Sequence, residues 1–81
     1  MTKKILIVED EEYIAEMYKM KLEIAGYDVR IAPDGVEGVR LVYEYRPDLV
    51  LLDLIMPNKN GYQFIKEIRE DIKVSKTKIF K

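Results

Sequence analysis

The sequence contains neither cysteine nor histidine among its 81 residues. Without cysteine the chain has no disulfide bonds, no thiolate nucleophile and no ligands for iron–sulfur clusters. Without histidine it also lacks the commonest protein ligand for metals and the commonest general base at neutral pH. The chemistry of this protein therefore has to depend on carboxylates and hydroxyl groups.

Long apolar runs and an excess of one charge are absent as well. No segment approaches the roughly 20 apolar residues of a membrane span, and no apolar run near the N-terminus is long enough for a signal peptide. The 14 basic and 15 acidic residues give a net charge of -1, which argues against general nucleic-acid binding. We therefore expect residues 1–81 to form a single globular domain in the cytoplasm, without a membrane or nucleic-acid partner.

Two short runs of β-branched and aliphatic residues predict strands at the centre of a sheet, buried on both faces. The first is Lys4–Val8, and the carboxylates of Glu9 and Asp10 follow it; the second is Leu49–Leu52, and Asp53 follows it. A third run, residues 27–31, alternates apolar and polar side chains and suits an edge strand. Residues 77–80 are a weaker candidate for a fourth strand.

Three segments between these strands have helical periodicity. The first, residues 12–25, starts with acidic residues and is expected to end at Gly26 in a left-handed conformation. The second starts at a capping box of Asp34 and Glu37 and ends before Pro47, and the third starts between residues 60 and 63. The residues expected to face the core are Ile14, Met17, Tyr18, Leu22 and Ala25 in the first helix; Val36, Val39 and Tyr43 in the second; and Phe64 or Ile65, Ile68 and Ile72 in the third.

Alternating strands and helices with short turns predict an α/β fold with a parallel sheet. The expected strand order is second, first, third, fourth, and right-handed crossovers place the first helix on one face and the other two on the opposite face. The winding direction reverses between the first and third strands, and ligands of such sheets bind at this switch point. Glu9, Asp10 and Asp53 are expected to meet there.

Three carboxylates at adjacent strand ends need neutralisation, since two unit charges 4 Å apart repel by roughly 4 kcal/mol at an effective dielectric constant of 20. A shared proton or a divalent cation could supply it, and Mg²⁺ suits a site with few carboxylates and several waters. Residues 9–12 have a simpler explanation as a solvated acidic first turn, which we prefer for Glu11 and Glu12. That explanation is weaker for Asp53, because an acid that ends a buried strand is costly unless paired.

The segments KILIVEDEE and LVLLDLIMPNKNG resemble the receiver domain of two-component response regulators, which has a CheY-like, flavodoxin-like fold. The resemblance implies that Asp53 is a phospho-acceptor, phosphorylated by a sensor histidine kinase, a phosphotransfer protein or a small acyl phosphate. It also implies that Asp10, Asp53 and the main-chain carbonyl of Ile55 hold Mg²⁺, with Glu9 reaching the ion directly or through water. Such a module accepts a phosphoryl group in signal transduction, and we expect it not to be an enzyme in its own right.

The 81 residues reach only the fourth of the family's five strands. The family's Ser or Thr after the fourth strand and its Lys after the fifth have no counterparts here, so phosphorylation is expected to be impaired. One helix cannot cover one face of a four-stranded sheet, so a homo-oligomer through the sheet face or edge is expected.

Two other functions compete with the phospho-acceptor. The alternative is a non-signalling fragment that self-assembles as a minimal flavodoxin-like folding unit. A phosphatase of the haloacid dehalogenase type, which needs a second Asp two residues after its nucleophile, is discounted because Ile55 stands at that place.

Overall fold

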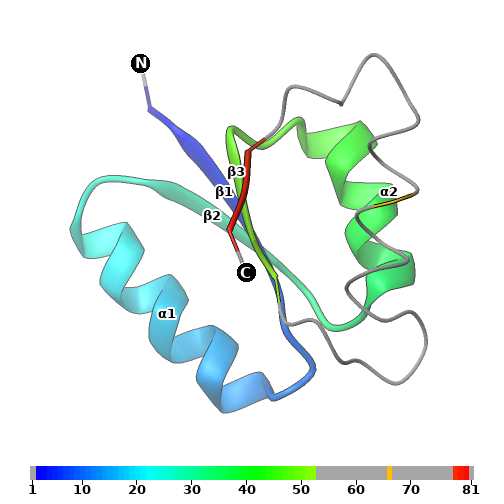
Figure 1. The fold of residues 1–81 in the computed structure, drawn as a ribbon. Helices are drawn as coiled ribbons and strands as arrows, with labels where there is room; N and C mark the ends of the chain where they lie inside the picture. The colour runs from blue at the N-terminus through cyan, green and yellow to red at the C-terminus, as the bar shows by residue number, and fades with distance from the viewer. Residues whose placement is uncertain (1, 53–65, 67–77, 81) are drawn as a thin grey trace.

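A computed structural model describes residues 2–52, 66 and 78–80 (Figure 1). The elements are β1 (Lys4–Val8), α1 (Glu12–Ile24), β2 (Asp28–Ala32), α2 (Gly35–Tyr45), β3 (Leu49–Leu52) and β4 (Lys78–Phe80). The predicted alternation of strands and helices is confirmed in this part of the chain. The predicted third helix lies outside the described residues, apart from Lys66, which is helical.

The four strands form one parallel sheet in the order β2-β1-β3-β4, as predicted. The alternating strand β2 lies at one edge, and the strands β1 and β3, which are apolar except for Lys4, lie in the middle. Val8 is in register with Ala32 of β2 and also with Leu52 of β3. Three neighbouring strands therefore end at the same level.

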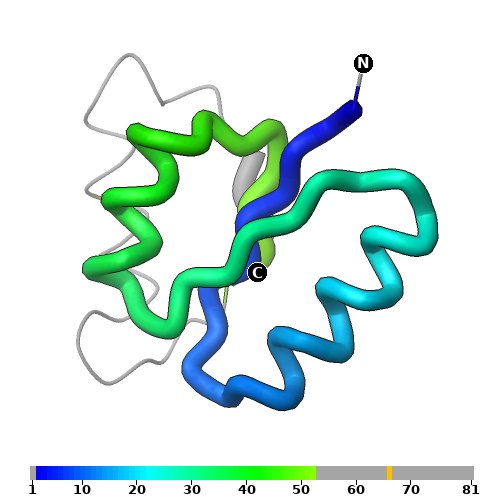
Figure 2. Tube along the Cα trace, turned by 180° about the vertical axis from the view of Figure 1, so that it is seen from behind, coloured from blue at the N-terminus to red at the C-terminus, as the bar shows by residue number. Residues whose placement is uncertain are grey.

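The helices α1 and α2 lie on opposite faces of the sheet (Figures 1 and 2). Successive residues of a strand point to opposite faces, so β1 contributes to two separate hydrophobic clusters. The cluster beneath α1 contains Ile5, Ile7, Ala15 and Val29, and the cluster beneath α2 contains Leu6, Val8, Ala32, Val42, Val50 and Leu52. The expected placement of the first two helices is thus confirmed.

Helix α1 faces the sheet with a stripe that matches the predicted one only in part. Leu22 packs against the cluster beneath the helix as predicted, and Ile14 is half-buried. Ala15 is its one fully buried residue, and Leu22 is half-buried beside it. Met17 and Tyr18, predicted to face the core, are 43% and 46% exposed, and Ala25 is exposed at the C-cap. The small side chain of Ala15 allows the helix to approach the strands closely, whereas periodicity alone could not choose between the two apolar faces of this helix.

Helix α2 also differs from the prediction in one residue. Val36, expected to face the core, is 55% exposed, whereas Val39 and Tyr43 pack against the cluster as predicted. The buried positions of the helix are Gly35, Gly38 and Val42. Because glycine has no side chain, the two glycines let the helix backbone lie close to the sheet, and this rotates Val36 outward.

The C-terminal ends of the two helices follow from their local sequences. Gly26 has φ +101, the positive φ predicted for the residue that ends α1. Arg46 ends α2 in the left-handed region with φ 53, and its N–H donates to the carbonyl of Val42 at 3.1 Å. Pro47 follows and cannot continue the helix. Neither of the helices traced in full is long and apolar enough to cross a membrane.

Candidate functional site

The carboxyl edge of the sheet is where the described residues of the predicted site lie. Val8, Ala32 and Leu52 end their strands in register, and the N–H of Glu9 donates to the carbonyl of Ala32 at 3.0 Å. From this edge the chain enters α1 on one face and α2 on the other (Figure 1). This is the topological switch point at which open α/β sheets bind ligands.

Glu9 and Asp10 lie together directly after β1, at the centre of this edge. Glu9 is half-buried and Asp10 is exposed. The Oε2 atom of Glu9 accepts a hydrogen bond from the main-chain N–H of Asp10 at 3.0 Å. Two carboxylates thus lie at the end of a buried strand. They offer only oxygen atoms as metal ligands, and such ligands suit a hard divalent cation.

Asp53 and Ile55, the other two predicted site residues, lie outside the described residues. Asp53 is the next residue in the sequence after Leu52, whose strand partner Val8 precedes Glu9. Among residues 2–52, 66 and 78–80, no three acidic side chains gather closely enough to hold a metal ion. The predicted ligand set needs Asp53, and so the complete set stays a prediction.

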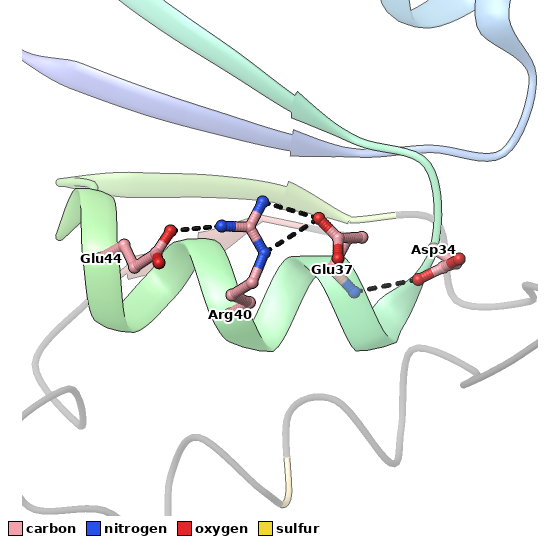
Figure 3. Close-up of polar contacts among 4 residues, drawn as sticks. All are labelled: Asp34, Glu37, Arg40 and Glu44. Atoms are coloured by element: carbon pink, nitrogen blue, oxygen red, sulfur yellow. Dashed lines mark hydrogen bonds and ion pairs between the residues drawn. The ribbon is translucent and has the colours of Figure 1, made fainter.

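Asp34 lies at the same edge, where it caps α2 (Figure 3). Its Oδ1 atom accepts a hydrogen bond from the N–H of Glu37 at 2.9 Å, which satisfies one unpaired donor of the first helical turn. Glu37 also forms an ion pair, in which its Oε2 atom lies 2.7 Å from Nη2 of Arg40. Arg40 also pairs with Glu44. Asp34 is therefore explained by the start of the helix.

The carboxyl edge of the sheet is acidic, whereas the amino end carries charges of both signs. Glu9 and Asp10 lead into Glu11 and Glu12 at the start of α1, so the carboxyl edge is acidic. At the amino end, the Nζ atom of Lys4 and the Cζ atom of Arg30 lie 5.3 and 5.1 Å from the ring centroid of Tyr45. Asp28 and Asp48 also lie at the amino end, where Oδ2 of Asp48 accepts a hydrogen bond from the N–H of Lys4 at 2.8 Å. The acidic carboxyl edge therefore favours a cation, and Lys4 and Arg30 lie away from it.

One surface feature was missed by the sequence reasoning. Tyr13, Met17, Met20 and Ile24 are all exposed on α1, on the side opposite Ala15. Their signal was present in the sequence, because they are spaced four, three and four residues apart. The prediction that Met17 faces the core hides this pattern, because it removes one of the four members.

A comparison with protein families matches residues 5–80 to the response regulator receiver domain. Chemotaxis protein CheY4 of Vibrio cholerae is similar at 33% identity and a TM-score of 0.91, over 98% of this chain. The N-terminal domain of a response regulator receiver protein from Methanoculleus marisnigri is similar at 30% identity and a TM-score of 0.90, over 94% of this chain. A receiver domain from Francisella, that of response regulator 1452, is similar at 29% identity and a TM-score of 0.88, over 96%.

The chain is shorter than each of these structures. It spans 66% of the Vibrio chain, 62% of the Methanoculleus chain and 63% of the Francisella chain. The match runs from residue 5 to residue 80, and so it includes β2, β3, β4, α1, α2 and all of β1 except Lys4.

Proposed function

Because the chain belongs to the response regulator receiver domain family, we propose that it is a phospho-acceptor of two-component signal transduction, phosphorylated at Asp53. One observation carries the proposal. The aligned ends of β1 and β3 put Val8 beside Leu52, and each of these residues is followed by a carboxylate in the sequence. A nucleophile and its charge-neutralising ligands would then come from neighbouring strands.

The proposed reaction transfers a phosphoryl group to the side chain of Asp53. A carboxylate oxygen of Asp53 attacks the phosphorus atom, and the bond from phosphorus to the leaving group breaks, with its electron pair kept by the leaving group. The donor is a phosphohistidine of a sensor histidine kinase or phosphotransfer protein, or a small acyl phosphate. The donor supplies the histidine, which this chain does not contain.

Mg²⁺ is the proposed cofactor, held by Glu9, Asp10, Asp53 and the main-chain carbonyl of Ile55. Glu9 and Asp10 offer only oxygen donors at an acidic edge, which supports this choice of ion. When bound, Mg²⁺ offsets negative charge on the oxygens of the transferred group. The contribution of the chain is to keep the nucleophile and the two neighbouring carboxylates at one strand edge, so that attack is in line.

The direct test is intact-mass measurement after incubation with acetyl phosphate and Mg²⁺. We expect an added mass of one phosphoryl group in the wild type and none in Asp53→Asn. Asp28→Asn is the matched control, because Asp28 starts β2 at the opposite end of the sheet and should not affect transfer. Removal of Mg²⁺ with a chelator should prevent the reaction.

Two outcomes would contradict the proposal. The first is a folded wild-type sample that gains no mass, and the second is an adduct that persists in Asp53→Asn. Circular dichroism of each variant separates loss of reaction from loss of structure. An adduct that forms equally well with chelator would contradict the role of Mg²⁺ alone.

The proposed partners and cellular location of this chain follow from its family. Receiver domains interact with histidine kinases or phosphotransfer proteins, and we place this chain in the cytoplasm, where such partners would phosphorylate it. No full-length membrane helix is found among the described residues.

A second candidate function is self-assembly through the sheet. Ile31, Leu49 and Leu51 are only half-buried on the face covered by α1. Apolar strand residues that remain partly exposed favour association. This candidate predicts oligomers in sedimentation experiments together with no phosphoryl adduct on Asp53.

A further inference from the structure

Helix α1 carries an apolar stripe on the side that faces away from the sheet. We call the four residues Tyr13, Met17, Met20 and Ile24 the outer stripe; their exposed fractions are 72%, 43%, 62% and 80%. Ala15 packs against the strands from the opposite side of the helix. The outer stripe is therefore not part of the core, and it leaves apolar surface in contact with water.

The spacing of the outer stripe is that of a helix that pairs with another helix. Its members are four, three and four residues apart, which is the spacing of the a and d positions in a heptad repeat. Tyr13 and Met20 take d positions, and Met17 and Ile24 take a positions. A surface hollow, where a side chain from a facing helix could insert, is lined by Tyr13, Met17 and Met20 together with the acidic residues Glu11, Glu12 and Glu16.

The charges that flank the outer stripe identify the partner helix. Glu16 lies on one side of the stripe and Lys21 on the other, and both side chains are exposed. Glu16 occupies a g position and Lys21 the following e position. In a parallel pair of helices, a g residue of one helix faces the e residue that comes five positions later in the other helix. Glu16 of one copy would then face Lys21 of the second copy, and the two-fold symmetry would produce this ion pair twice.

The same charges argue against an antiparallel pair. In an antiparallel two-fold arrangement, each side of the stripe meets the same side of the second copy. Glu12, Glu16 and Glu23 lie on one side with a single basic residue, Lys19, so that mainly acidic side chains would face mainly acidic side chains. The parallel arrangement avoids this repulsion and replaces it with opposite charges.

We propose that α1 is a docking surface for a second copy of this chain, with the two α1 helices packed in parallel along their outer stripes. The interface is isologous, because the same residues contribute from both copies. Helix α1 has 13 residues and a length of about 20 Å. The interface is therefore small, and we expect a weak dimer. The inference does not depend on phosphorylation of Asp53, and it uses a different surface from self-assembly through the sheet.

Equilibrium sedimentation of the full chain, at concentrations from about 10 μM to 1 mM, is the first test. The wild type should show a concentration-dependent dimer. Met20→Glu should remain a monomer, because it places a charge in the middle of the outer stripe. Val36→Glu is the matched control: Val36 is 55% exposed on α2, so this variant should dimerise like the wild type.

Three results of this experiment would overturn the proposal. They are a wild type that stays monomeric at every concentration, a dimer that survives Met20→Glu, and an assembly larger than a dimer. Survival of association in Met20→Glu would indicate the sheet as the interface. Far-ultraviolet circular dichroism of both variants should match the wild type, since both substitutions are at exposed positions.

A charge swap tests the pairing of Glu16 with Lys21. Lys21→Glu alone should weaken the dimer about tenfold, because two ion pairs are lost and acidic residues then face each other. The double variant Glu16→Lys with Lys21→Glu should restore the wild-type dissociation constant, because the opposite charges then meet in reversed positions. A double variant no tighter than Lys21→Glu alone would contradict the parallel arrangement.

Cross-linking tests the orientation independently of affinity. The chain contains no cysteine, so a single introduced cysteine can form a disulfide only with its copy. In a parallel pair, Tyr13→Cys should cross-link to itself and Ile24→Cys should cross-link to itself. In an antiparallel pair, only a mixture of the two variants would cross-link, and that result would overturn the proposal. Val36→Cys should not cross-link.

Discussion

The hydroxyl group of Tyr45 donates a 2.8 Å hydrogen bond to the main-chain carbonyl of Asp28. This contact joins the last residue of α2 to the first residue of β2, at the edge of the sheet far from the candidate site. The Nζ atom of Lys4 donates to the carbonyl of Tyr45 at 2.8 Å, so β1 is tied to the same point. Tyr45 therefore connects a helix to two strands, through its hydroxyl group and its main-chain carbonyl.

Replacement of Tyr45 by Phe should reduce the stability of the fold. The substitution keeps the ring beneath Lys4 and Arg30 but removes the hydrogen bond to Asp28. A typical intramolecular hydrogen bond contributes about 1 kcal/mol, so we expect the free energy of unfolding to fall by about that amount. Urea titration followed by circular dichroism measures it; an unchanged midpoint would show that water replaces the lost hydrogen bond.

Tyr45 should also make the fold sensitive to alkaline pH. Burial raises the pKa of its hydroxyl above the ordinary value of about 10, and hydrogen bonding to Asp28 raises it further. The folded state therefore favours the neutral phenol, and its contribution is fully present below about pH 10 and is lost as the pH rises above that value. The stability difference between the wild type and Tyr45→Phe should shrink above pH 10, by up to about 1.4 kcal/mol per pH unit.

The other five tyrosines do not confuse this comparison. They are present in both proteins, so their titration cancels in the difference between the wild type and Tyr45→Phe. Unfolding free energies measured at several pH values between 8 and about 11 provide the comparison. A difference that stays constant over this range would show that Tyr45 titrates alike in the folded and unfolded chain.

Asp34 should stabilise the start of α2 through its side chain. Loss of an N-cap acceptor costs about 1 kcal/mol, so Asp34→Ala should lower the free energy of unfolding by about that amount. Asp34→Asn is the control, because an amide oxygen can accept the same hydrogen bond from Glu37. Equal losses in the two variants would show that the charge of Asp34 matters more than its hydrogen bond.

The fold was largely predictable because the strands have distinct burial patterns. Continuous apolar runs identified β1 and β3 as central, and the alternating run identified β2 as an edge strand. The faces of the helices were harder to predict. Helix α1 has apolar residues on two sides. Its buried side is marked only by Ala15, which is small, and by Leu22, so the apolar pattern on this side is weak.

The sequence pattern predicted where the candidate site lies in the fold, but not which ligand it binds. Parallel strands in register place the residues after β1 and β3 at one edge, and the sequence shows which of these residues are acidic. The choice of Mg²⁺ and of Asp53 as nucleophile comes from the family resemblance, because carboxylates at a strand edge are compatible with a shared proton as well as a cation. Charge pattern thus predicts where a ligand binds but not which ligand it is.

Ala15 provides a test of the face that α1 turns to the sheet. Its side chain is fully buried against the strands, so Ala15→Leu should force the helix away and destabilise the fold by about 1–3 kcal/mol. Ala25→Leu is the matched control, since Ala25 is exposed and its replacement should change stability by less than about 0.5 kcal/mol. Urea titration of both variants measures the difference. Equal effects would contradict the packing of Ala15 against the strands.

Mg²⁺ should stabilise the folded chain, and Asp10 should determine by how much. A ligand that binds only the folded state at about ten times its dissociation constant contributes about 1.4 kcal/mol. Asp10→Asn should reduce this gain, because one ligand oxygen loses its charge. The same substitution should raise stability in the absence of Mg²⁺, since it relieves repulsion between Glu9 and Asp10 at the end of β1.

These two opposite effects distinguish a cation site from a solvated acidic turn. Thermal unfolding with and without Mg²⁺ should therefore give curves for the wild type and Asp10→Asn that cross as Mg²⁺ is added. Asp28→Asn, at the other end of the sheet, should respond to Mg²⁺ as the wild type does. If Mg²⁺ shifts the wild type and Asp10→Asn equally, the ion binds elsewhere, and the acidic edge serves only the start of α1.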